Sequence, residues 1–345
     1  MFLAAERTGV LEDPRVTVAG FLREWLALKE HTLKSSTIAN YRAYVHDDLI
    51  PAFGRMRLID LRGRHIEEWA TGERLKGRGQ VTVYRISATL SSALSHAVRS
   101  RRLPYNPARH AITARPASPE RECWDPAQAA RFLHHNQLHY ADQLWNLFEL
   151  ILGTGLRRGE AMALHWSDVH FMERKAFVRW TLAAVGNNEL HLGPPKTTAS
   201  RNWVSLSPRV IAALERQACH QATLLPPGSP LEGLVFGTVD GAPLRPQYVL
   251  DQLRRRSAEA EVPLIGVHDL RHTAATIMIM QGVPLGVVSK TLRHSTLATT
   301  LNIYGHLLKY ASDDAVDTLA SALDAALGES EPDDGDDPGG CLSVA

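Results

Sequence analysis

Cysteines and long apolar segments are both scarce in this 345-residue chain, and each shortage excludes a class of protein. The 3 cysteines, Cys123, Cys219 and Cys341, are far apart, so they form neither a disulfide framework nor a CxxC metal site. No apolar run approaches the roughly 20 residues of a membrane-spanning helix, and the N-terminus lacks the regions of a secretory signal. A nucleotide-binding GxxxxGK[ST] motif is also missing. We therefore expect a protein of the reducing cytoplasm that uses no metal or other cofactor.

The formal net charge is only +1, but the charges are unevenly distributed. Residues 15–115 contain 18 Lys and Arg against 8 Asp and Glu, whereas residues 309–345 contain 1 against 10. A strongly basic segment indicates a nucleic acid partner at that end of the chain. A solvated basic surface without a ligand is the alternative.

Helical periodicity and shifts in composition predict an N-terminal helical domain at residues 15–108, followed by a linker at 109–122. Four segments of this domain carry apolar residues at helical spacing: 16–30, 38–46, 60–70 and 81–100. Residues 1–14 and the Gly-, Pro- and Asp-rich tail at 328–345 are predicted to be disordered.

Residues 123–310 predict a second domain in which helices are combined with a small antiparallel sheet. The predicted strands are 176–182, 189–195 and 202–206, with a turn at 196–200 between the last two. The predicted helices are 127–134, 142–153, 208–224, 246–259, 268–280, 284–292 and 298–304. A further amphipathic helix, 311–327, is expected to pack on a neighbouring protomer, with its own domain as the alternative. The fold class is thus mainly α with a small antiparallel β-sheet.

The segment His268-Asp269-Leu270-Arg271-His272 carries the clearest chemical pattern. On a helix His268 and Arg271 lie three residues apart, so both project from one face. A guanidinium beside a titratable ring suits a phosphodiester. Alone, however, an HxxR pattern is also typical of a surface helix with a salt bridge.

Further basic and hydroxyl-bearing residues extend this pattern in both directions along the chain. Arg157 follows a Gly-Leu pair, a lysine lies in the predicted turn, and a histidine and a tyrosine follow the HxxR segment. This series resembles the active site of the tyrosine recombinase, or phage integrase, family over residues 16–310. The six matching residues, in chain order, are Arg157, Lys196, His268, Arg271, His294 and Tyr304.

The resemblance implies a helical core-binding domain and a mixed α+β catalytic domain of the DNA breaking-rejoining type. Tyr304 would attack a DNA phosphodiester and form a 3′-phosphotyrosine, while Arg157 and Arg271 neutralise the transition state. The neighbouring Arg158 is the less favoured choice for the first arginine, and Tyr310 is the rival nucleophile.

The resemblance also assigns the other polar residues of the series. Lys196 would be the general acid that protonates the leaving 5′ oxygen, and His268 a general base or proton shuttle. His294 would donate to a non-bridging oxygen. Glu160 would orient the Arg157 guanidinium, and Asp269 would stabilise the charged cluster.

Other residues are predicted to contact DNA or to pack locally. The partners implied are double-stranded DNA, a homotetramer on it, and an accessory DNA-bending or directionality factor, at the bacterial nucleoid. His165, His272 and His306 are predicted to be packing residues or DNA contacts. The expected DNA-binding residues are Lys34, Ser36, Thr37, Tyr41, Arg42 and Arg201.

Two features separate this chain from the usual family pattern. The residue before His294 is usually glycine, and here it is Arg293. The spacing between His294 and Tyr304 resembles that of phage and conjugative-element integrases, which favours a mobile-element integrase. An additional N-terminal arm-binding domain, frequent in that branch, would be either absent or encoded before residue 1. A chromosome-dimer (Xer-like) resolvase, a type IB topoisomerase and a catalytically inactive DNA-binding regulator remain as alternatives.

Overall fold

The structure is a computed structural model, and it describes most of the chain between residues 15 and 325. The described residues are 15–112, 115–116, 121–186, 189–195, 197–294, 296–304, 317 and 319–325. Within them no helix is long and apolar enough to cross a membrane. The predictions for Lys196, His306, Tyr310 and the two chain ends lie outside the described residues.

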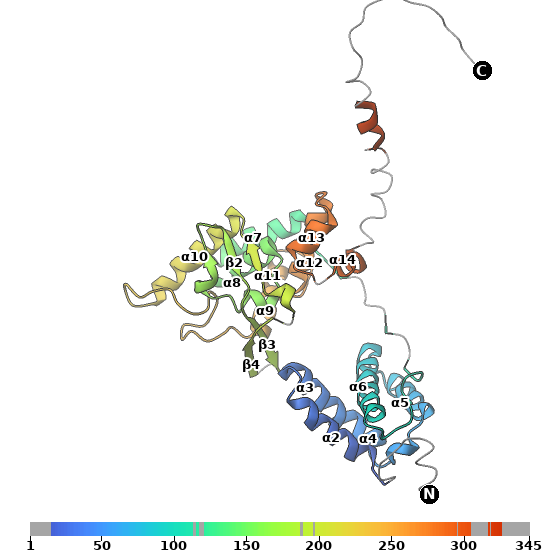
Figure 1. Cartoon of the computed structure of the whole chain (residues 1–345). Helices are drawn as coiled ribbons and strands as arrows, with labels where there is room; N and C mark the ends of the chain where they lie inside the picture. Colours follow the sequence, from blue (N-terminus) through green and yellow to red (C-terminus); the bar gives the residue numbers. More distant parts are fainter. Residues whose placement is uncertain are drawn as a thin grey trace, which may run out of the picture.

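The N-terminal helices enclose a core of their own, at the blue end of the chain in Figure 1. Phe21, Trp25, Leu49 and Leu90 are among its buried side chains. Thr17 caps the first helix as its N-cap, because its hydroxyl accepts the Gly20 N–H at 3.2 Å. The helices are α2 (Val18–Glu30), α3 (Ser35–Ala43), α4 (Ile50–Phe53), α5 (Gly63–Leu75) and α6 (Gln80–Arg99).

The second helix differs from its predicted form at both ends. A serine or threonine before residue 38, Ser36 or Thr37, was the expected N-cap, but α3 begins at Ser35 with Lys34 as its N-cap residue and no side-chain cap. Beyond α3 the helix widens into the π-helix Tyr44–Leu49 and continues as α4, with Pro51 in the first turn. Because proline has no N–H, the continuous helix lacks one backbone hydrogen bond at this point.

A second core lies within the C-terminal helices, with α8 at its centre and α10 and α12 against it (Figure 1). Trp124, Phe132 and Phe148 form a chain of ring contacts through this core. The helices are α7 (Pro126–His139), α8 (Gln143–Thr154), α9 (Arg158–Ala161), α10 (Pro208–Leu224), α11 (Pro246–Glu259), α12 (Asp269–Met280), α13 (Leu285–Thr291) and α14 (Leu297–Tyr304). Ala111, within the predicted linker, packs into the first core, and the domain boundaries stay a prediction.

The strands form two small antiparallel sheets where the sequence predicted one. The strands are β1 (Val169–His170), β2 (Lys175–Phe177), β3 (Thr181–Val185), β4 (Glu189–Gly193) and β5 (Trp203–Ser205). One sheet has the order β1-β2-β5, and β3 and β4 form a separate hairpin. The predicted strand 176–182 is split because the chain leaves the first sheet near Arg179, which donates to the buried Asp168 at 2.9 Å. β4 and β5, which the sequence predicted to be joined by a turn within one sheet, therefore belong to different sheets. The predicted fold class, mainly α with small antiparallel sheets, is confirmed.

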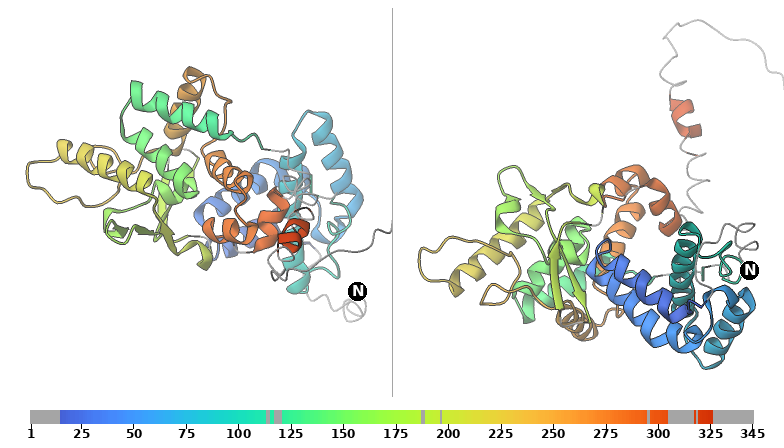
Figure 2. Two further views of the ribbon diagram at one scale, coloured as in Figure 1. Left: turned by 90° about the horizontal axis from the view of Figure 1, so that it is seen from above. Right: turned by 60° about the horizontal axis from the view of Figure 1, so that its bottom comes forward.

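The β3–β4 hairpin extends from the second core to the start of α3 (Figures 1 and 2). There the Lys34 ammonium donates to the Pro194 carbonyl at 3.2 Å. The two cores are thus in contact at a point where basic residues of the first group of helices meet the end of β4.

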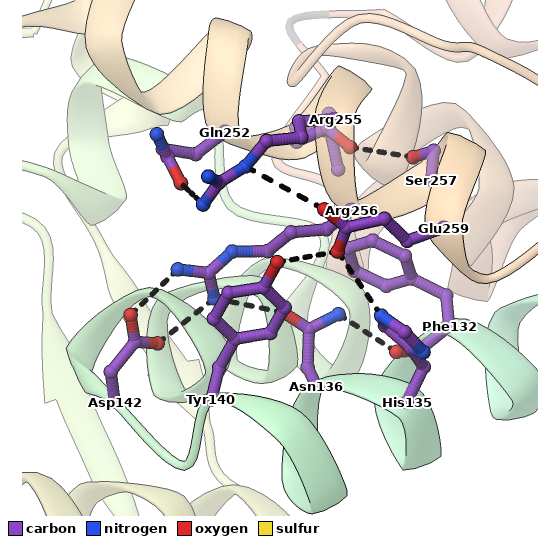
Figure 3. A network of polar contacts seen from close by, with 11 residues as sticks. Phe132, His135, Asn136, Tyr140, Asp142, Gln252, Arg255, Arg256, Ser257 and Glu259 are labelled. Atoms are coloured by element: carbon purple, nitrogen blue, oxygen red, sulfur yellow. Dashed lines mark hydrogen bonds and ion pairs between the residues drawn. The ribbon is translucent and has the colours of Figure 1, made fainter.

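A buried arginine fastens α11 to the helices beneath it (Figure 3). Arg256 donates to both carboxylate oxygens of Asp142, at 2.9 and 2.6 Å, and to Asn136 Oδ1 at 2.9 Å. Its guanidinium also lies over the Tyr140 ring, 3.8 Å from the centroid. This network holds α7, α8 and α11 together.

Candidate active site

Arg271 lies in the first turn of α12, with 2% of its surface exposed. Its Nη1 donates to the Gly155 carbonyl and its Nη2 to the Leu292 carbonyl, both at 2.6 Å. Gly155 has φ +64, a left-handed conformation that favours glycine, and a Cβ there would lie 2.5 Å from Leu292 Cδ2. Desolvation, and then the Arg157 charge, lower the pKa of Arg271 to about 9, so it stays charged at pH 7.

Arg157 is held at the start of α9 by the carboxylate of Glu160, which also accepts the Arg157 backbone N–H at the helix N-terminus. Its Nη1 donates to Glu160 Oε1 at 2.8 Å and to Ser200 Oγ at 3.0 Å, and its backbone N–H donates to Glu160 Oε2 at 3.1 Å. Glu160 is buried, whereas 34% of the Arg157 side chain is exposed. One nitrogen of the guanidinium is thus anchored while part of the group stays open to solvent.

A second arginine shares the same carboxylate. Arg293 Nη2 donates to Glu160 Oε2 at 2.6 Å, and both side chains are almost completely buried. The loop that carries Arg293 also carries His294, whose Nδ1 lies 2.7 Å from the hydroxyl of the buried Thr300. Desolvation and the Arg271 charge lower the pKa of His294 to about 4, so this ring is neutral at pH 7.

Tyr304 ends α14 and is 3% exposed, with its hydroxyl 2.6 Å from His272 Nδ1. Burial raises the pKa of Tyr304. Desolvation, and then the Arg121 charge, lower the pKa of His272 to about 4. The imidazole is therefore neutral at pH 7, and in the tautomer that carries its proton on Nε2 the phenol donates and Nδ1 accepts.

His268 and Asp269 lie at the entrance of α12 and not on the tyrosine. The His268 ring is exposed and packs edge-on against the His272 ring, with 5.1 Å between centroids. Partial desolvation, and then His272, lower the pKa of His268. Asp269 accepts from Arg121 at 2.8 Å and from the Gly266 N–H at 2.9 Å, so its direct contacts are not with the arginines of the pocket.

The residues predicted to bind DNA differ in their exposure and in the contacts that their side chains already make. Arg42 forms a 2.6 Å ion pair with Glu30 on α2. The Tyr41 ring stacks on the buried Trp25, with 5.3 Å between centroids, so much of this side chain belongs to the first core. Lys34 is exposed and reaches a backbone carbonyl at the end of β4. The other three are at least partly exposed: Ser36, Thr37 and Arg201.

The contact between His272 and Tyr304 is a feature of the site that the sequence did not predict. His272 was assigned to packing or to DNA, because its partner lies 32 residues away. One signal was available: His268 and His272 are four residues apart, so a helix places both on the same face.

The arrangement brings together what an attack on a phosphate diester needs. Arg157 and Arg271 are close enough for the charge of one to lower the pKa of the other. Near them, the buried Tyr304 hydroxyl is hydrogen-bonded to the neutral His272 imidazole. Among the described residues, no His, Cys, Asp and Glu side chains form a group of three or more that would hold a metal ion.

Comparison with known families gives two matches along the chain. A family model described as the Phage integrase family matches residues 124–310, more than half of the chain. A second, described as Phage integrase, N-terminal SAM-like domain, matches residues 17–72.

Individual relatives match over most of the chain. A protein of Caldanaerobacter subterraneus subsp. tengcongensis named "Tyrosine recombinase XerC-like" is 27% identical, covering 92% of this chain and 86% of the relative. The ICEBs1 integrase of Bacillus subtilis is 23% identical, covering 87% and 81%. Among solved structures, the Tn1549 transposon integrase in complex with a circular intermediate DNA has a TM-score of 0.75 at 20% identity, covering 88% of this chain and 99% of that one. A lambda integrase tetramer bound to a Holliday junction has a TM-score of 0.59 at 16% identity, covering 86% and 80%.

Proposed function

The chain belongs to the phage integrase family, the tyrosine recombinases, and we propose that it integrates or excises a mobile element by cutting and rejoining double-stranded DNA at a specific site. The observation that carries this proposal is the buried Tyr304 hydroxyl on His272, next to the paired guanidiniums of Arg157 and Arg271. The mobile-element assignment is supported by the names of two relatives, the ICEBs1 integrase and the Tn1549 transposon integrase.

In the proposed reaction, Tyr304 Oη attacks the scissile phosphorus. An O–P bond forms to the phenol, the bond from phosphorus to the 5′ oxygen breaks, and the 5′ oxygen leaves as a hydroxyl. The product is a 3′-phosphotyrosine, which the 5′-hydroxyl of a second strand attacks in the reverse sense. One phosphodiester replaces another, so the reaction needs no nucleoside triphosphate.

Arg157 and Arg271 would bind the non-bridging oxygens and neutralise the charge of the transition state. Loss of one positioned arginine in phosphoryl transfer lowers rates on the order of 10³-fold. Arg271 suits this role because its backbone carbonyl partners orient it without neutralising it. His294, neutral and anchored to Thr300, would donate from its other ring nitrogen to a non-bridging oxygen.

The proton leaving Tyr304 would go to His272, the group that its hydroxyl already contacts. His268, the base expected from the family pattern, would act behind it as a proton shuttle to solvent. Lys196 remains the proposed acid for the 5′ oxygen. An ordinary phenol costs about 4 kcal/mol to ionise at pH 7, and burial raises the pKa of Tyr304 further. The tyrosine is thus held protonated until a phosphate meets the arginines.

The proposed assembly is a homotetramer on DNA in the bacterial cytoplasm, at the nucleoid, with an accessory DNA-bending or directionality factor. It is supported by the lambda integrase structure, which is a tetramer bound to a Holliday junction. The basic first 115 residues would supply the electrostatic grip on the phosphate backbone.

A covalent-trapping assay tests the proposal. Duplexes selected from a random library by binding to the full chain are nicked at successive positions, so that cleavage releases a short strand and traps the complex. We expect a protein–DNA adduct that persists in denaturant, is lost in Tyr304→Phe and is retained in the matched control Tyr310→Phe.

The same assay separates the alternatives. An absent adduct in the wild type, with binding intact, would support a DNA-binding regulator. An adduct accompanied by relaxation of any supercoiled plasmid would support a topoisomerase. Recombination confined to plasmids that carry a chromosome-terminus site would support a resolvase.

A further inference from the structure

Arg293 lies in the corner between α13 and α14, in a conformation that does not suit an arginine. Its φ is +55, the left-handed region that favours glycine. This conformation explains why glycine is usual at this position in the family. The chain carries an arginine there and buries it, with 5% of its surface exposed. A strained backbone and a desolvated charge at one residue indicate a function that offsets both.

The side chain of Arg293 is directed at one carboxylate. Its Nη2 donates to Glu160 Oε2 at 2.6 Å, and the two side chains are 3% and 2% exposed. Its Nε and Nη1 are also buried and have no hydrogen-bond partner within the part of the chain that the structure describes. Among the described residues, the one hydrogen bond of this side chain is therefore with the residue that anchors Arg157.

Glu160 is consequently shared between two guanidiniums. Oε1 accepts from Arg157 Nη1, and Oε2 accepts from the Arg157 backbone N–H and from Arg293. With Arg157 alone, the carboxylate would cancel the charge of the arginine that it orients. With Arg293 added, the group has one positive charge in excess.

We infer that Arg293 is a positioning residue for strand cleavage, acting through Glu160 on Arg157. Arg293 binds Oε2 of the Glu160 carboxylate and compensates its charge, so Glu160 orients the Arg157 guanidinium without neutralising it. Arg293 also ties down the corner whose two other residues serve the pocket: the Leu292 carbonyl accepts from Arg271, and His294 bonds Thr300. The inference rests on the proposed function, since the ligand of Arg157 is the scissile phosphate.

The test compares single-turnover cleavage of the trapped nicked duplex by four proteins: wild type, Arg293→Gly, Arg293→Lys and Arg174→Gly. Glycine fits the left-handed backbone, so Arg293→Gly removes the side chain without straining the fold. Arg174→Gly is the matched control, an exposed arginine with φ +48. At saturating protein, we expect Arg293→Gly to cleave about tenfold to a hundredfold more slowly. DNA affinity should be unchanged, Arg293→Lys should recover part of the rate, and Arg174→Gly should cleave at the wild-type rate.

The route through Glu160 is tested by repeating Arg293→Gly in a Glu160→Gln background. Because both changes act on Arg157, Arg293→Gly should slow cleavage much less in the Glu160→Gln background than it does in the wild type. Additive effects would overturn the inference. So would an Arg293→Gly protein that melts at a lower temperature but cleaves at the wild-type rate, which is the result of a structural role. A wild type that forms no adduct would overturn the proposed function itself, whereas a full adduct in wild type and Arg293→Gly alike overturns only the role of Arg293.

Discussion

At the scale of single residues, the pocket contains buried charges that are balanced in two different ways. Arg271 is surrounded by backbone carbonyls, which offset part of its desolvation and leave its charge uncancelled. Glu160 is surrounded by two guanidiniums and is fully neutralised. This group of residues is therefore positively charged, in agreement with an anionic ligand.

His272 makes a pH-dependent contribution to stability that a single substitution reveals. Its pKa is lowered to about 4 in the folded chain, against about 6.5 in an unfolded one, so the unfolded state binds the extra proton. This contribution is fully present above pH 6.5 and is lost as the pH falls towards 4. His272→Asn keeps an acceptor for Tyr304 but does not titrate. We predict that lowering the pH from 6.5 to 4 reduces the free energy of unfolding of this variant by up to about 3 kcal/mol less than that of the wild type.

Urea unfolding of both proteins between pH 4 and 7 measures the difference. Parallel pH profiles would mean that His272 is not held neutral, and would remove the argument that it accepts the proton of Tyr304.

The sequence was sufficient to recognise the family but did not predict how the site residues contact one another. The recognition rested on the order of six residues, which are Arg157, Lys196, His268, Arg271, His294 and Tyr304. The bond between His272 and Tyr304 depends on how α14 packs on α12, which no local pattern specifies. The role of Arg293 was likewise hidden, because its backbone conformation and its partner 133 residues away appear only in the fold.

At the scale of helices and strands, the amphipathic helices were the most predictable elements. α10 and α11 begin and end at the predicted residues, because a proline in the first turn and a one-sided apolar stripe mark each of them. The strands were less predictable. β2 pairs with β5, almost 30 residues further on, and not with the next strand-like segment, so local composition did not determine the partner.

Gly155 joins α8 to the pocket, and its replacement should affect stability and activity together. Gly155→Ala introduces a Cβ at φ +64 that lies 2.5 Å from Leu292, whose carbonyl holds Arg271. We predict a loss of about 2–4 kcal/mol and slower cleavage. Gly228→Ala, at φ +82 with no atom within 4 Å of the added Cβ, is the matched control and should cost about 1 kcal/mol without changing cleavage. Equal losses in urea unfolding would contradict the close approach of Leu292.

The Arg256 network should account for much of the attachment of α11 (Figure 3). Arg256→Met removes the hydrogen bonds to Asp142 and Asn136 and leaves both without their buried donor. We predict a loss of about 3 kcal/mol. The adjacent Arg255→Ala, on the exposed side of the helix, should change stability by less than about 0.5 kcal/mol. Comparable denaturation midpoints for the two variants would show that the network is not what holds α11.

At the scale of the whole molecule, the basic and acidic residues lie at opposite ends of a chain with almost no net charge. The β3–β4 hairpin brings the second core to Lys34, at the start of a helix in the basic region. Because β3 also packs on α9, which begins beside Arg157, DNA bound to the basic helices would lie near the proposed site as well.

Salt dependence tests this view of the basic end. The logarithm of the affinity for a short duplex should fall linearly with the logarithm of salt concentration, and Lys34→Ala should reduce the slope by about one phosphate contact, or roughly 0.9. Lys76→Ala is the control, because that ammonium already pairs with Glu73 at 2.8 Å. Identical slopes for wild type and Lys34→Ala would exclude Lys34 from the DNA contact.

The central claim is that the Tyr304 hydroxyl, at the end of α14, attacks a phosphate that Arg157 and Arg271 bind. Its most direct measurement is peptide mapping of the trapped complex by mass spectrometry, after digestion of both protein and DNA. The account predicts one modified peptide, with a nucleotide joined through its 3′-phosphate to Tyr304. A nucleotide on any other residue, or a 5′-phosphate linkage, would contradict it.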